Sequence, residues 1–377
     1  MRLSAPWLTS AETAAIFDAL GDHGAWFVGG CVRNGLLDAP VADLDICTEL
    51  RPETVMELAT AAGLRAVPTG IDHGTVTVVS NGTPYEITTL RRDIETDGRH
   101  ASVAFTRELA EDAARRDFTI NALYATRDGA VLDPNGAGLD DLKARRVRFI
   151  GDADARIAED YLRILRFFRF HAWYADPTGG LDAEGLAACA ANLDGIARLS
   201  AERVGSEVQT LLRAPDPAPA VAAMDQTHVL AAVLPGASSR MLTVLTGLED
   251  GLRPDAIRRL AALGGDANAL RLSKAEAKRL TLFRDEMAST TTPGPLGYHH
   301  GVDAARDILV LRAALFEQPV DANALHAAEI GAKATFPVKA ADLPDFQGKA
   351  LGDQLKSLEQ AWIDSAFTLS KSQLLSR

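Results

Sequence analysis

Short apolar runs at strand spacing dominate the first part of the chain, and helical spacing dominates the second. Up to about residue 147, glycine and polar turns interrupt β-rich runs, which predicts an α/β or α+β region with a modest sheet. The predicted strands are residues 25–28, 41–47, 73–80, 84–90 and 147–150. From about residue 153 onward, alanine- and leucine-rich amphipathic segments predict helices only. Residues 290–297 are expected to be a flexible connection or a plain surface loop.

Composition narrows the class of protein. With 377 residues, 47% apolar and 24% charged, the chain can form two or more domains of a folded globular protein. The net charge of −12 argues against a general coat for nucleic acid, although basic residues can still gather on one face. No run approaches the roughly 20 apolar residues of a membrane span, so we expect a cytoplasmic protein without membrane association. The three scattered cysteines predict neither a zinc site nor disulfides.

A glycine pair follows the first predicted strand. Gly29 and Gly30 stand between the apolar segment WFV and a helical segment that carries Arg33. Backbone N–H groups at such a helix start bind phosphate well, and an arginine adds a fixed charge. Glycines are also common at strand-to-helix turns for purely geometric reasons. This feature alone therefore favours a plain turn over a nucleotide site.

Two aspartates in the next predicted strand change that balance. Asp43 and Asp45 are separated by one residue, so they share one face of a strand while their apolar neighbours face the core. Two such carboxylates repel each other unless a cation lies between them, and Mg²⁺ prefers oxygen ligands. The favoured interpretation is a two-metal site for in-line attack on phosphorus. Metal-dependent glycosyltransferases also carry paired aspartates, but the preceding glycine-arginine turn is not expected in them.

Two further segments offer polar groups for the same site. Glu86 lies in a predicted strand whose flanking Tyr85 and Ile87 face the opposite side, so it is a candidate third carboxylate or an exposed strand residue. Arg116 and Asp117 precede an apolar stretch. Beside a nucleotide, the arginine would donate to phosphate and the aspartate would accept from a ribose hydroxyl. A surface salt bridge would have the same local pattern.

Residues 152–170 form the most informative predicted helix. A charged stripe lies opposite an apolar stripe, as on any surface helix, but every cation in it is arginine. Asp160 and Arg163, spaced i to i+3, place an acceptor beside a fork of donors. This pair matches the Watson–Crick edges of cytosine and adenine. Uracil and guanine would leave buried polar groups unpaired, at a cost of about 1–3 kcal/mol each, so the pair predicts selection of C and A.

Five segments in order resemble a known family. They are GGCVRN…DLDIC, YEITTLRRDIETDGRHASVAF, EDAARRDFTINAL, RIAEDYLRILRFFRF and LSAERVGSEV. Together they resemble the class II tRNA nucleotidyltransferases, the bacterial CCA-adding enzymes, with the poly(A) polymerases as close relatives. The resemblance implies an α+β fold in which a polymerase-β-like nucleotidyltransferase head with a small mixed sheet precedes helical parts that hold tRNA. The implied limits are 1–148 for the head, 149–212 for a helical neck, 213–289 for a helical body and 290–377 for a helical tail.

The resemblance also implies roles for individual residues. The glycine turn and Arg33 would contact the triphosphate, and Asp43 and Asp45 would hold Mg²⁺, with Glu86 as the candidate third catalytic carboxylate. Residues 94–102 would match a flexible loop that helps the site change from C to A. The remaining nucleotide-binding roles would be those of Arg116 and Asp117 at phosphate and ribose, Asp160 and Arg163 at the base, and Glu159, Arg166 and Arg169 as their supports.

One position departs from the pattern of the family. Asn34 follows Arg33 where the family has an aspartate. An amide is a poorer metal ligand than a carboxylate, so we expect Asn34 to support the site rather than to bind metal.

The implied activity is template-independent addition of C, C and A from CTP and ATP to the 3′ end of tRNA, with no protein partner evident. Poly(A) polymerase and partial C- or A-adding enzymes are the near alternatives. A non-catalytic tRNA-binding protein is a more distant one, because the paired aspartates are intact. For tRNA contact we expect either a phosphate-binding surface or plain solvated helix faces at Arg253, Arg258, Arg259, Arg271, Lys274, Lys278 and Arg279.

Overall fold

The computed structural model describes residues 1–97 and 100–377, and it describes no side chain from residue 93 to residue 103. The loop expected at residues 94–102 therefore lies in part outside the described residues. No helix in the described part of the chain has both the length and the apolar character that a membrane span requires.

The described chain divides into two compact units. The first comprises Met1–Leu211 and Gln226–Val233, and the second comprises Leu212–Asp225 and Leu234–Arg377. The four-part division into head, neck, body and tail stays a prediction.

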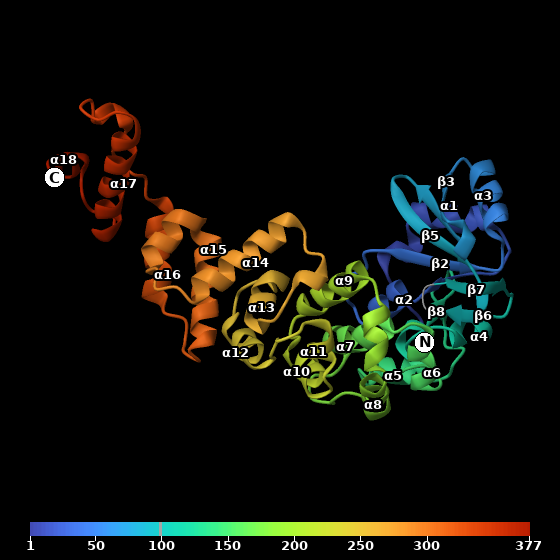
Figure 1. The fold of residues 1–377 in the computed structure, drawn as a ribbon. Coiled ribbons are helices and arrows are strands. Elements are labelled where there is room, and N and C mark those ends of the chain that lie inside the picture. The colour runs from blue at the N-terminus through green and yellow to red at the C-terminus, as the bar shows by residue number, and fades with distance from the viewer. Residues whose placement is uncertain (98–99) are drawn as a thin grey trace. The chain divides into compact units, whose positions relative to one another are not determined.

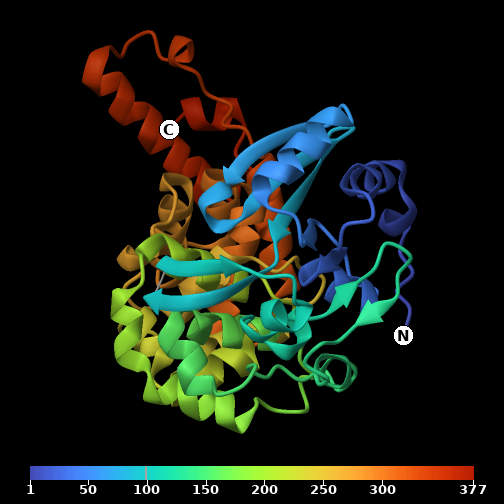
Figure 2. The same ribbon diagram turned by 90° about the vertical axis from the view of Figure 1, so that its right-hand side faces the viewer.

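The first unit is built on a mixed sheet (Figure 1). The strands of this unit are β1 (Ala25–Val28), β2 (Leu44–Thr48), β3 (Arg65–Gly70), β4 (Thr75–Ser80), β5 (Thr83–Thr89), β6 (Arg91–Asp97), β7 (His100–Phe105), β8 (Tyr124–Ala125) and β9 (Val131–Leu132). The order in the seven-stranded sheet is β3-β4-β5-β2-β1-β8-β9, and every neighbouring pair is antiparallel except β2 with β5. Strands β6 and β7 form a separate antiparallel ribbon, cyan in Figure 2.

Side-chain alternation along β2 and β5 follows the prediction. Leu44, Ile46, Tyr85 and Ile87 are all buried. Helices α1 (Ala11–Leu20) and α3 (Pro52–Ala61) pack against β4, and α3 also packs against β3 (Figure 1). Since apolar side chains alternate with polar ones, the polar residues of β2 and β5 lie on the opposite face from this core.

An aromatic cluster joins the head to the helices that follow it. The fully buried Phe118 ring lies 5.0 Å from the Phe149 ring, 6.4 Å from Phe167 and 4.9 Å from Phe170, measured between centroids. This packing places helix α7 against the segment just after Asp117. Besides α1 and α3, the helices of the first unit are α2 (Gly30–Leu36), α4 (Leu109–Ala114), α5 (Gly138–Lys143), α6 (Ala153–Glu159), α7 (Leu162–Tyr174), α8 (Ala183–Ala191), α9 (Ala201–Leu212) and α11 (Val229–Val233).

The second unit consists of helices. They are α10 (Ala218–Gln226), α12 (Arg240–Leu248), α13 (Ala256–Leu263), α14 (Lys274–Met287), α15 (Pro293–Leu315), α16 (Ala322–Lys333), α17 (Gly348–Asp364) and α18 (Lys371–Leu375). Helices α15 and α16 approach backbone to backbone, because a Cβ atom at Gly297 would lie 1.9 Å from the Ala328 carbonyl oxygen. Helix α15 is kinked at Gly301, where φ is 80°.

A buried ion network holds helix α13. Arg258 lies 2.7 Å from Glu249 and 2.7 Å from Asp307, and Arg259 lies 2.7 Å from the second oxygen of Glu249. Both arginines are buried, so the prediction that they belong to a phosphate-binding surface is wrong. The physical reason is that every residue of α13 is buried, whereas an amphipathic pattern predicts that the charged face is solvated.

The other members of that predicted surface divide into two groups. Arg279 is partly exposed and pairs with Asp255 and Asp307, each at 2.7 Å. The remaining four side chains are exposed and stay a predicted phosphate-binding surface. They are Arg253, Arg271, Lys274 and Lys278.

Three local predictions can be compared with the fold. Every element assigned beyond residue 153 in the described chain is a helix, as predicted. The strand predicted at residues 147–150 is wrong, because only an isolated bridge joins Phe149 to Phe118. The connection predicted at residues 290–297 is largely helical, since α15 begins at Pro293, and proline is favourable in the first turn of a helix.

Replacing Glu249 with alanine is expected to destabilise the helical unit strongly. The change would leave two buried guanidinium groups without their shared carboxylate, at a cost of about 3–5 kcal/mol. Urea unfolding followed by circular dichroism measures the loss. The exposed Glu329→Ala on α16 is the matched control and should change the free energy of unfolding little. A loss for Glu249→Ala no greater than that of the control would contradict the assignment.

Candidate active site

The chain turns at Gly29 between β1 and α2. Gly29 has φ 71° and ψ −118°, a conformation that a side chain would strain, and its N–H donates to the Leu123 carbonyl at 3.1 Å. A Cβ atom at Gly29 would lie 3.6 Å from Arg116 Nη1, and one at Gly30 would lie 3.9 Å from Arg33 Nη2. Two guanidinium groups therefore border the open backbone of the predicted phosphate turn.

Three acidic residues come together on β2 and β5. Asp45 and Glu86 are partners in the parallel register of these strands, and Asp43 directly precedes β2. The pKa of Asp45 is raised to about 6, first by burial and then by the charges of Glu86 and Asp43, with Arg116 opposing them. The carboxylates are therefore close enough to repel one another. Their place next to the glycine turn is shown by Cys31, whose S–H donates to the Asp45 carbonyl at 3.7 Å.

The donor chemistry of this cluster fits a hard cation. Carboxylate oxygens suit Mg²⁺, which is usually held by one or two carboxylates, together with water and substrate phosphates, rather than by a complete protein cage. No group of three or more acidic, histidine or cysteine side chains in the described part of the chain is arranged to hold a metal ion. Substrate phosphates and water would therefore have to supply part of the coordination. The mutual repulsion at Asp45 is the feature that a bound cation would relieve.

Arg33 is held by neutral groups. It is buried, its Nη1 donates to Asn121 Oδ1, and its Nη2 donates to the Tyr174 hydroxyl at 2.8 Å. The guanidinium carbon lies 3.9 Å from the centroid of the Tyr174 ring and 5.1 Å from that of Phe170. Burial lowers the pKa of Arg33.

Asn34, at the position where an aspartate was expected, connects two parts of the site. Its Oδ1 accepts from Arg33 Nε at 3.1 Å and from Arg33 Nη2 at 3.0 Å. Its Nδ2 donates to the Pro40 carbonyl at 2.8 Å, a bond that a carboxylate could not make. Asn34 thus supports Arg33 and the loop that leads toward Asp43.

Arg116 is oriented by Asp112. The Asp112 carboxylate accepts from Arg116 at 2.9 Å, from Arg115 at 2.7 Å and from the Tyr124 hydroxyl at 2.8 Å. Burial favours the neutral form of Asp112, but the charges of Arg116 and Arg115 outweigh it and hold the pKa of Asp112 at about 2. Asp112 was not recognised from the sequence, where it is one of two adjacent acidic residues in a helix.

Asp117 binds Arg166 of helix α7. Its Oδ2 accepts from Arg166 Nε at 2.8 Å and Nη2 at 2.5 Å, while its Oδ1 accepts from Asn121 at 2.9 Å and from the Phe118 N–H at 2.8 Å. Burial opposes its charge, but Arg166 and these hydrogen bonds hold the pKa of Asp117 at about 2. Because Asn121 also accepts from Arg33, the chain of contacts runs from the phosphate turn to α7.

The helix predicted over residues 152–170 is interrupted at Asp160, so the prediction of one continuous helix is wrong. Asp160 has an extended backbone, with φ −154° and ψ 105°, and its carboxylate accepts from the Leu162 N–H at 3.1 Å at the start of α7. An aspartate in this arrangement favours a helix start over a helix interior. Its second oxygen accepts from Arg203 at 2.5 Å.

Arg163 follows Asp160 but pairs elsewhere. Its Nη1 donates to Glu159 Oε2 at 2.5 Å and to the Arg156 carbonyl at 2.9 Å, and its Nη2 donates to the Arg115 carbonyl at 3.3 Å. Asp160 and Arg163 are thus neighbours with separate partners.

Helix α9 supplies a carboxylate to two arginines of α7. Glu207 lies 2.5 Å from Arg169 and 3.8 Å from Arg166. The i to i+4 spacing of Arg203 and Glu207 in ERVGSE could have indicated a polar face on this helix. The supporting residues that sequence reasoning missed are Asp112, Asn121, Tyr174, Arg203 and Glu207.

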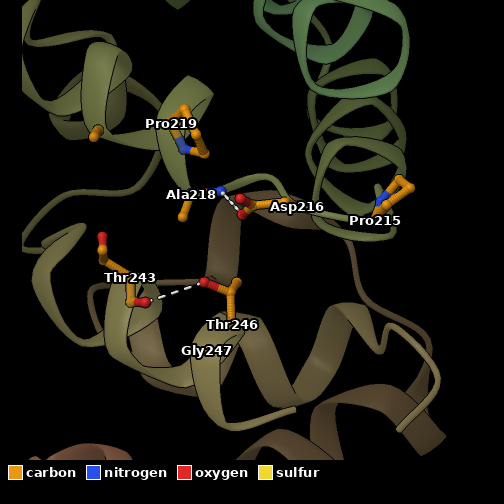
Figure 3. Close-up of a pocket in the computed structure, with 8 residues that line it drawn as sticks. Pro215, Asp216, Ala218, Pro219, Thr243, Thr246 and Gly247 are labelled. Carbon is orange, nitrogen blue, oxygen red and sulfur yellow. Dashed lines mark hydrogen bonds between the residues drawn. The ribbon is translucent and has the colours of Figure 1, made fainter. Parts of the chain in front are cut away.

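A cavity in the helical unit offers no comparable chemistry. It has a volume of about 420 Å³ and is lined by residues from Pro215 to Gly247 (Figure 3). Asp216 accepts from the Ala218 N–H at 3.0 Å, and the Thr246 hydroxyl donates to the Thr243 carbonyl at 3.1 Å (Figure 3). These polar groups serve the local backbone, so the acidic strands of the first unit remain the candidate site.

Family models match the chain in two places. Residues 25–148 match the poly(A) polymerase head domain, and residues 181–241 match the probable RNA- and SrmB-binding site of polymerase A. The first match covers the mixed sheet, the glycine turn and the three carboxylates. The head is therefore that of a nucleotidyltransferase, and the predicted fold class is confirmed.

Full-length relatives narrow this class. CCA tRNA nucleotidyltransferase 1, mitochondrial, of Mus musculus is 32% identical over an alignment 413 residues long, which covers 100% of this chain and 92% of the relative. The chain belongs to the family of the CCA tRNA nucleotidyltransferases, or CCA-adding enzymes. The Homo sapiens counterpart is 34% identical, over 94% of this chain and 86% of the relative. The crystal structure of the Bacillus stearothermophilus CCA-adding enzyme in complex with CTP is similar, with a TM-score of 0.77 at 27% identity, over 99% of this chain and 97% of that one.

The stability of the head is expected to depend on pH through Asp112. Its folded-state pKa of about 2 lies below the ordinary value of about 3.9, so its charge stabilises the fold fully above about pH 4. This contribution, about 2 kcal/mol, is lost as the pH falls toward 2. Urea unfolding at several pH values should show Asp112→Asn less stable than wild type above pH 4, with the difference shrinking toward pH 2. The exposed Asp22→Asn is the control, and a pH-independent difference for Asp112→Asn would refute the assignment.

Proposed function

We propose that this enzyme adds C, C and A, from CTP and ATP, to the 3′ end of tRNA without a nucleic-acid template. The observation that carries the proposal is the pairing of Asp45 with Glu86 beside a glycine turn that two arginines border. Similarity to CCA tRNA nucleotidyltransferases over the whole chain supports tRNA as the substrate. Poly(A) synthesis and the addition of only C or only A are not favoured by these relatives.

The glycine turn would receive the triphosphate. Gly29 and Gly30 carry no side chain that would block a phosphate group, and Arg33 and Arg116 would provide positive charge beside them. The predicted contact of Asp117 with a ribose hydroxyl would replace one of the bonds from Arg166, Asn121 or the Phe118 N–H, because these four bonds already use the acceptor positions of its carboxylate.

The acidic cluster would hold Mg²⁺ through Asp43 and Asp45, with Glu86 as the third carboxylate. Burial raises the pKa of Asp45 first, and the charges of Glu86 and Asp43 raise it further, so a cation that stabilises the charged form of Asp45 fits this position. Bound there, Mg²⁺ would lower the pKa of the terminal hydroxyl of tRNA and add positive charge near the α-phosphate.

The transfer itself needs positioning and charge stabilisation. The 3′-hydroxyl oxygen attacks the α-phosphorus and loses its proton to solvent. The bond between the α-phosphorus and the oxygen that bridges to the β-phosphorus breaks, so that pyrophosphate leaves. Arg33, Arg116 and the backbone of the glycine turn would stabilise the negative charge of the departing pyrophosphate. Since no covalent enzyme intermediate is required, the side chains act mainly by orientation.

Asp160 and Arg163 would read the incoming base. Each is held by a partner, Arg203 and Glu159 respectively, and each retains hydrogen-bonding capacity beyond those contacts. A carboxylate acceptor beside guanidinium donors matches C and A but not U or G. Glu159, Arg166 and Arg169 would keep this arrangement in place.

The limits of head, neck, body and tail given above, and the cytoplasmic location, stay predictions. The two mammalian relatives are named as mitochondrial proteins.

The function is tested with a tRNA that lacks its CCA end. Purified enzyme is offered CTP alone, ATP alone and both together, and the products are resolved on a sequencing gel. We expect two residues to be added from CTP alone and a complete CCA end from the mixture. A long A tail made while CTP is ignored would instead establish a poly(A) polymerase.

Replacing Asp43 or Asp45 with alanine is expected to reduce kcat for nucleotide addition by a factor of about 10³ or more, because each change removes a carboxylate from the metal site. Binding of tRNA, measured by filter retention, should be unchanged. The exposed Glu57→Ala on α3 is the matched control and should retain activity. Activity near the wild-type value in either aspartate variant would refute the metal assignment.

A further inference from the structure

Arg33 has no direct ion-pair partner among the described residues, and the charge of Asp117, which shares Asn121 with it, only partly opposes the effect of burial. In the part of the chain that the structure describes, no carboxylate oxygen lies within 4.0 Å of its guanidinium nitrogens. The acceptors of its N–H groups are the amides of Asn34 and Asn121 and the hydroxyl of Tyr174. Four other arginines of the site are ion-paired at 2.9 Å or less, namely Arg116, Arg163, Arg166 and Arg169.

A buried arginine without a counter-ion is costly, and burial accordingly lowers the pKa of Arg33. Such a charge stabilises an anion that arrives beside it, provided that the guanidinium is already oriented. Neutral groups can orient it without cancelling its charge. Tyr174 contacts the guanidinium in two different ways, through its ring and through its hydroxyl.

We propose that Tyr174 is a positioning residue that holds Arg33 toward the triphosphate of the incoming nucleotide. This inference rests on the proposed function, which assigns Arg33 to the triphosphate. The ring covers one face of the guanidinium at 3.9 Å, a cation–π contact that restricts its plane. The hydroxyl accepts from Nη2 at 2.8 Å, which fixes the rotation of the guanidinium within that plane.

The place of Tyr174 in the fold gives this contact a second consequence. Tyr174 is the last residue of α7, the helix that carries Arg163 and Arg166 in its first half. The same helix would therefore position the base-reading Arg163 near its start and the phosphate-binding Arg33 at its end. The shared ring of Phe170, which lies 5.1 Å from Arg33 and 5.2 Å from Arg166, continues this link along the helix.

Tyr174 also permits a cleaner test than its neighbours around Arg33. Asn121 additionally bonds Asp117, and Asn34 additionally bonds Pro40, so changes there disturb other contacts. Among the described residues, the Tyr174 hydroxyl makes no hydrogen bond except the one from Arg33. Tyr174→Phe therefore removes one bond and leaves the ring, and Tyr174→Leu removes both. Trp173→Phe, at the adjacent exposed residue that donates to Thr210, is the matched control.

The experiment measures KM and kcat for CTP and ATP, KM for tRNA, and the inhibition constant of inorganic tripolyphosphate. Equilibrium binding of CTP and of tripolyphosphate without tRNA is measured in parallel. Tyr174→Phe should raise KM for both nucleotides, and weaken tripolyphosphate binding, by the same factor of about five, which is about 1 kcal/mol. KM for tRNA and the preference between CTP and ATP should not change. Tyr174→Leu should weaken the affinity for nucleotides and tripolyphosphate by about tenfold or more, and the Trp173→Phe control should behave as wild type.

Two results would overturn the inference. One is a folded Tyr174→Phe variant with unchanged affinity for nucleotides and tripolyphosphate. The other is a fall in kcat or in melting temperature with unchanged nucleotide KM, which would show a merely structural role. Failure of the wild-type enzyme to extend tRNA would count against the proposed function, whereas the binding of tripolyphosphate to the Tyr174 variants would still decide the role of Tyr174.

Discussion

The ion pair between the buried Asp117 and the partly exposed Arg166 is the interaction on which the arrangement of the site depends. Asp117 belongs to the segment that follows α4, and Arg166 belongs to α7. Through Asn121 the same carboxylate is joined to Arg33, and through Glu207 the same arginine is joined to α9. Because the ion pair is largely shielded from water, loss of either partner would leave a charge without compensation. The two ends of the nucleotide site are thus held by one chain of polar contacts.

Positive and negative charges are distributed unevenly along this series of polar contacts. Arginines near the base-reading end have carboxylate partners, so their orientation is fixed and their net charge is largely balanced. At the end of the site that would bind phosphate, two groups lack a charge of the opposite sign in direct contact. The acidic cluster around Asp45 repels itself, and Arg33 has only neutral partners. A cation would neutralise the acidic cluster, and an anionic nucleotide would pair with Arg33. This is the charge distribution expected of a site that binds a nucleotide together with Mg²⁺.

The spacing of residues in the sequence was sufficient to predict the parts of the site that lie on one strand or one turn. The period of two in DLDI placed Asp45 opposite its buried neighbours, and the glycine pair marked the turn at Gly29. The prediction from residue spacing was wrong at Asp160, because the helical repeat of 3.6 residues continues in the sequence across the break between α6 and α7. It failed again at Arg258 and Arg259, because the pattern shows which residues are charged but not whether a second helix buries them. The family resemblance supplied roles that spacing could not.

By itself, the sequence determined the sheet-forming segments around the site, the helical character of the second half and the shared face of the acidic strand residues. These follow from neighbours within a few positions, where backbone geometry dictates which side chains lie together. Only the tertiary structure decided that Glu86 stands beside Asp45 through a parallel strand pair, and that Tyr174 covers Arg33 from the far end of another helix. Contacts of this kind join residues that are distant in sequence, so no local period encodes them.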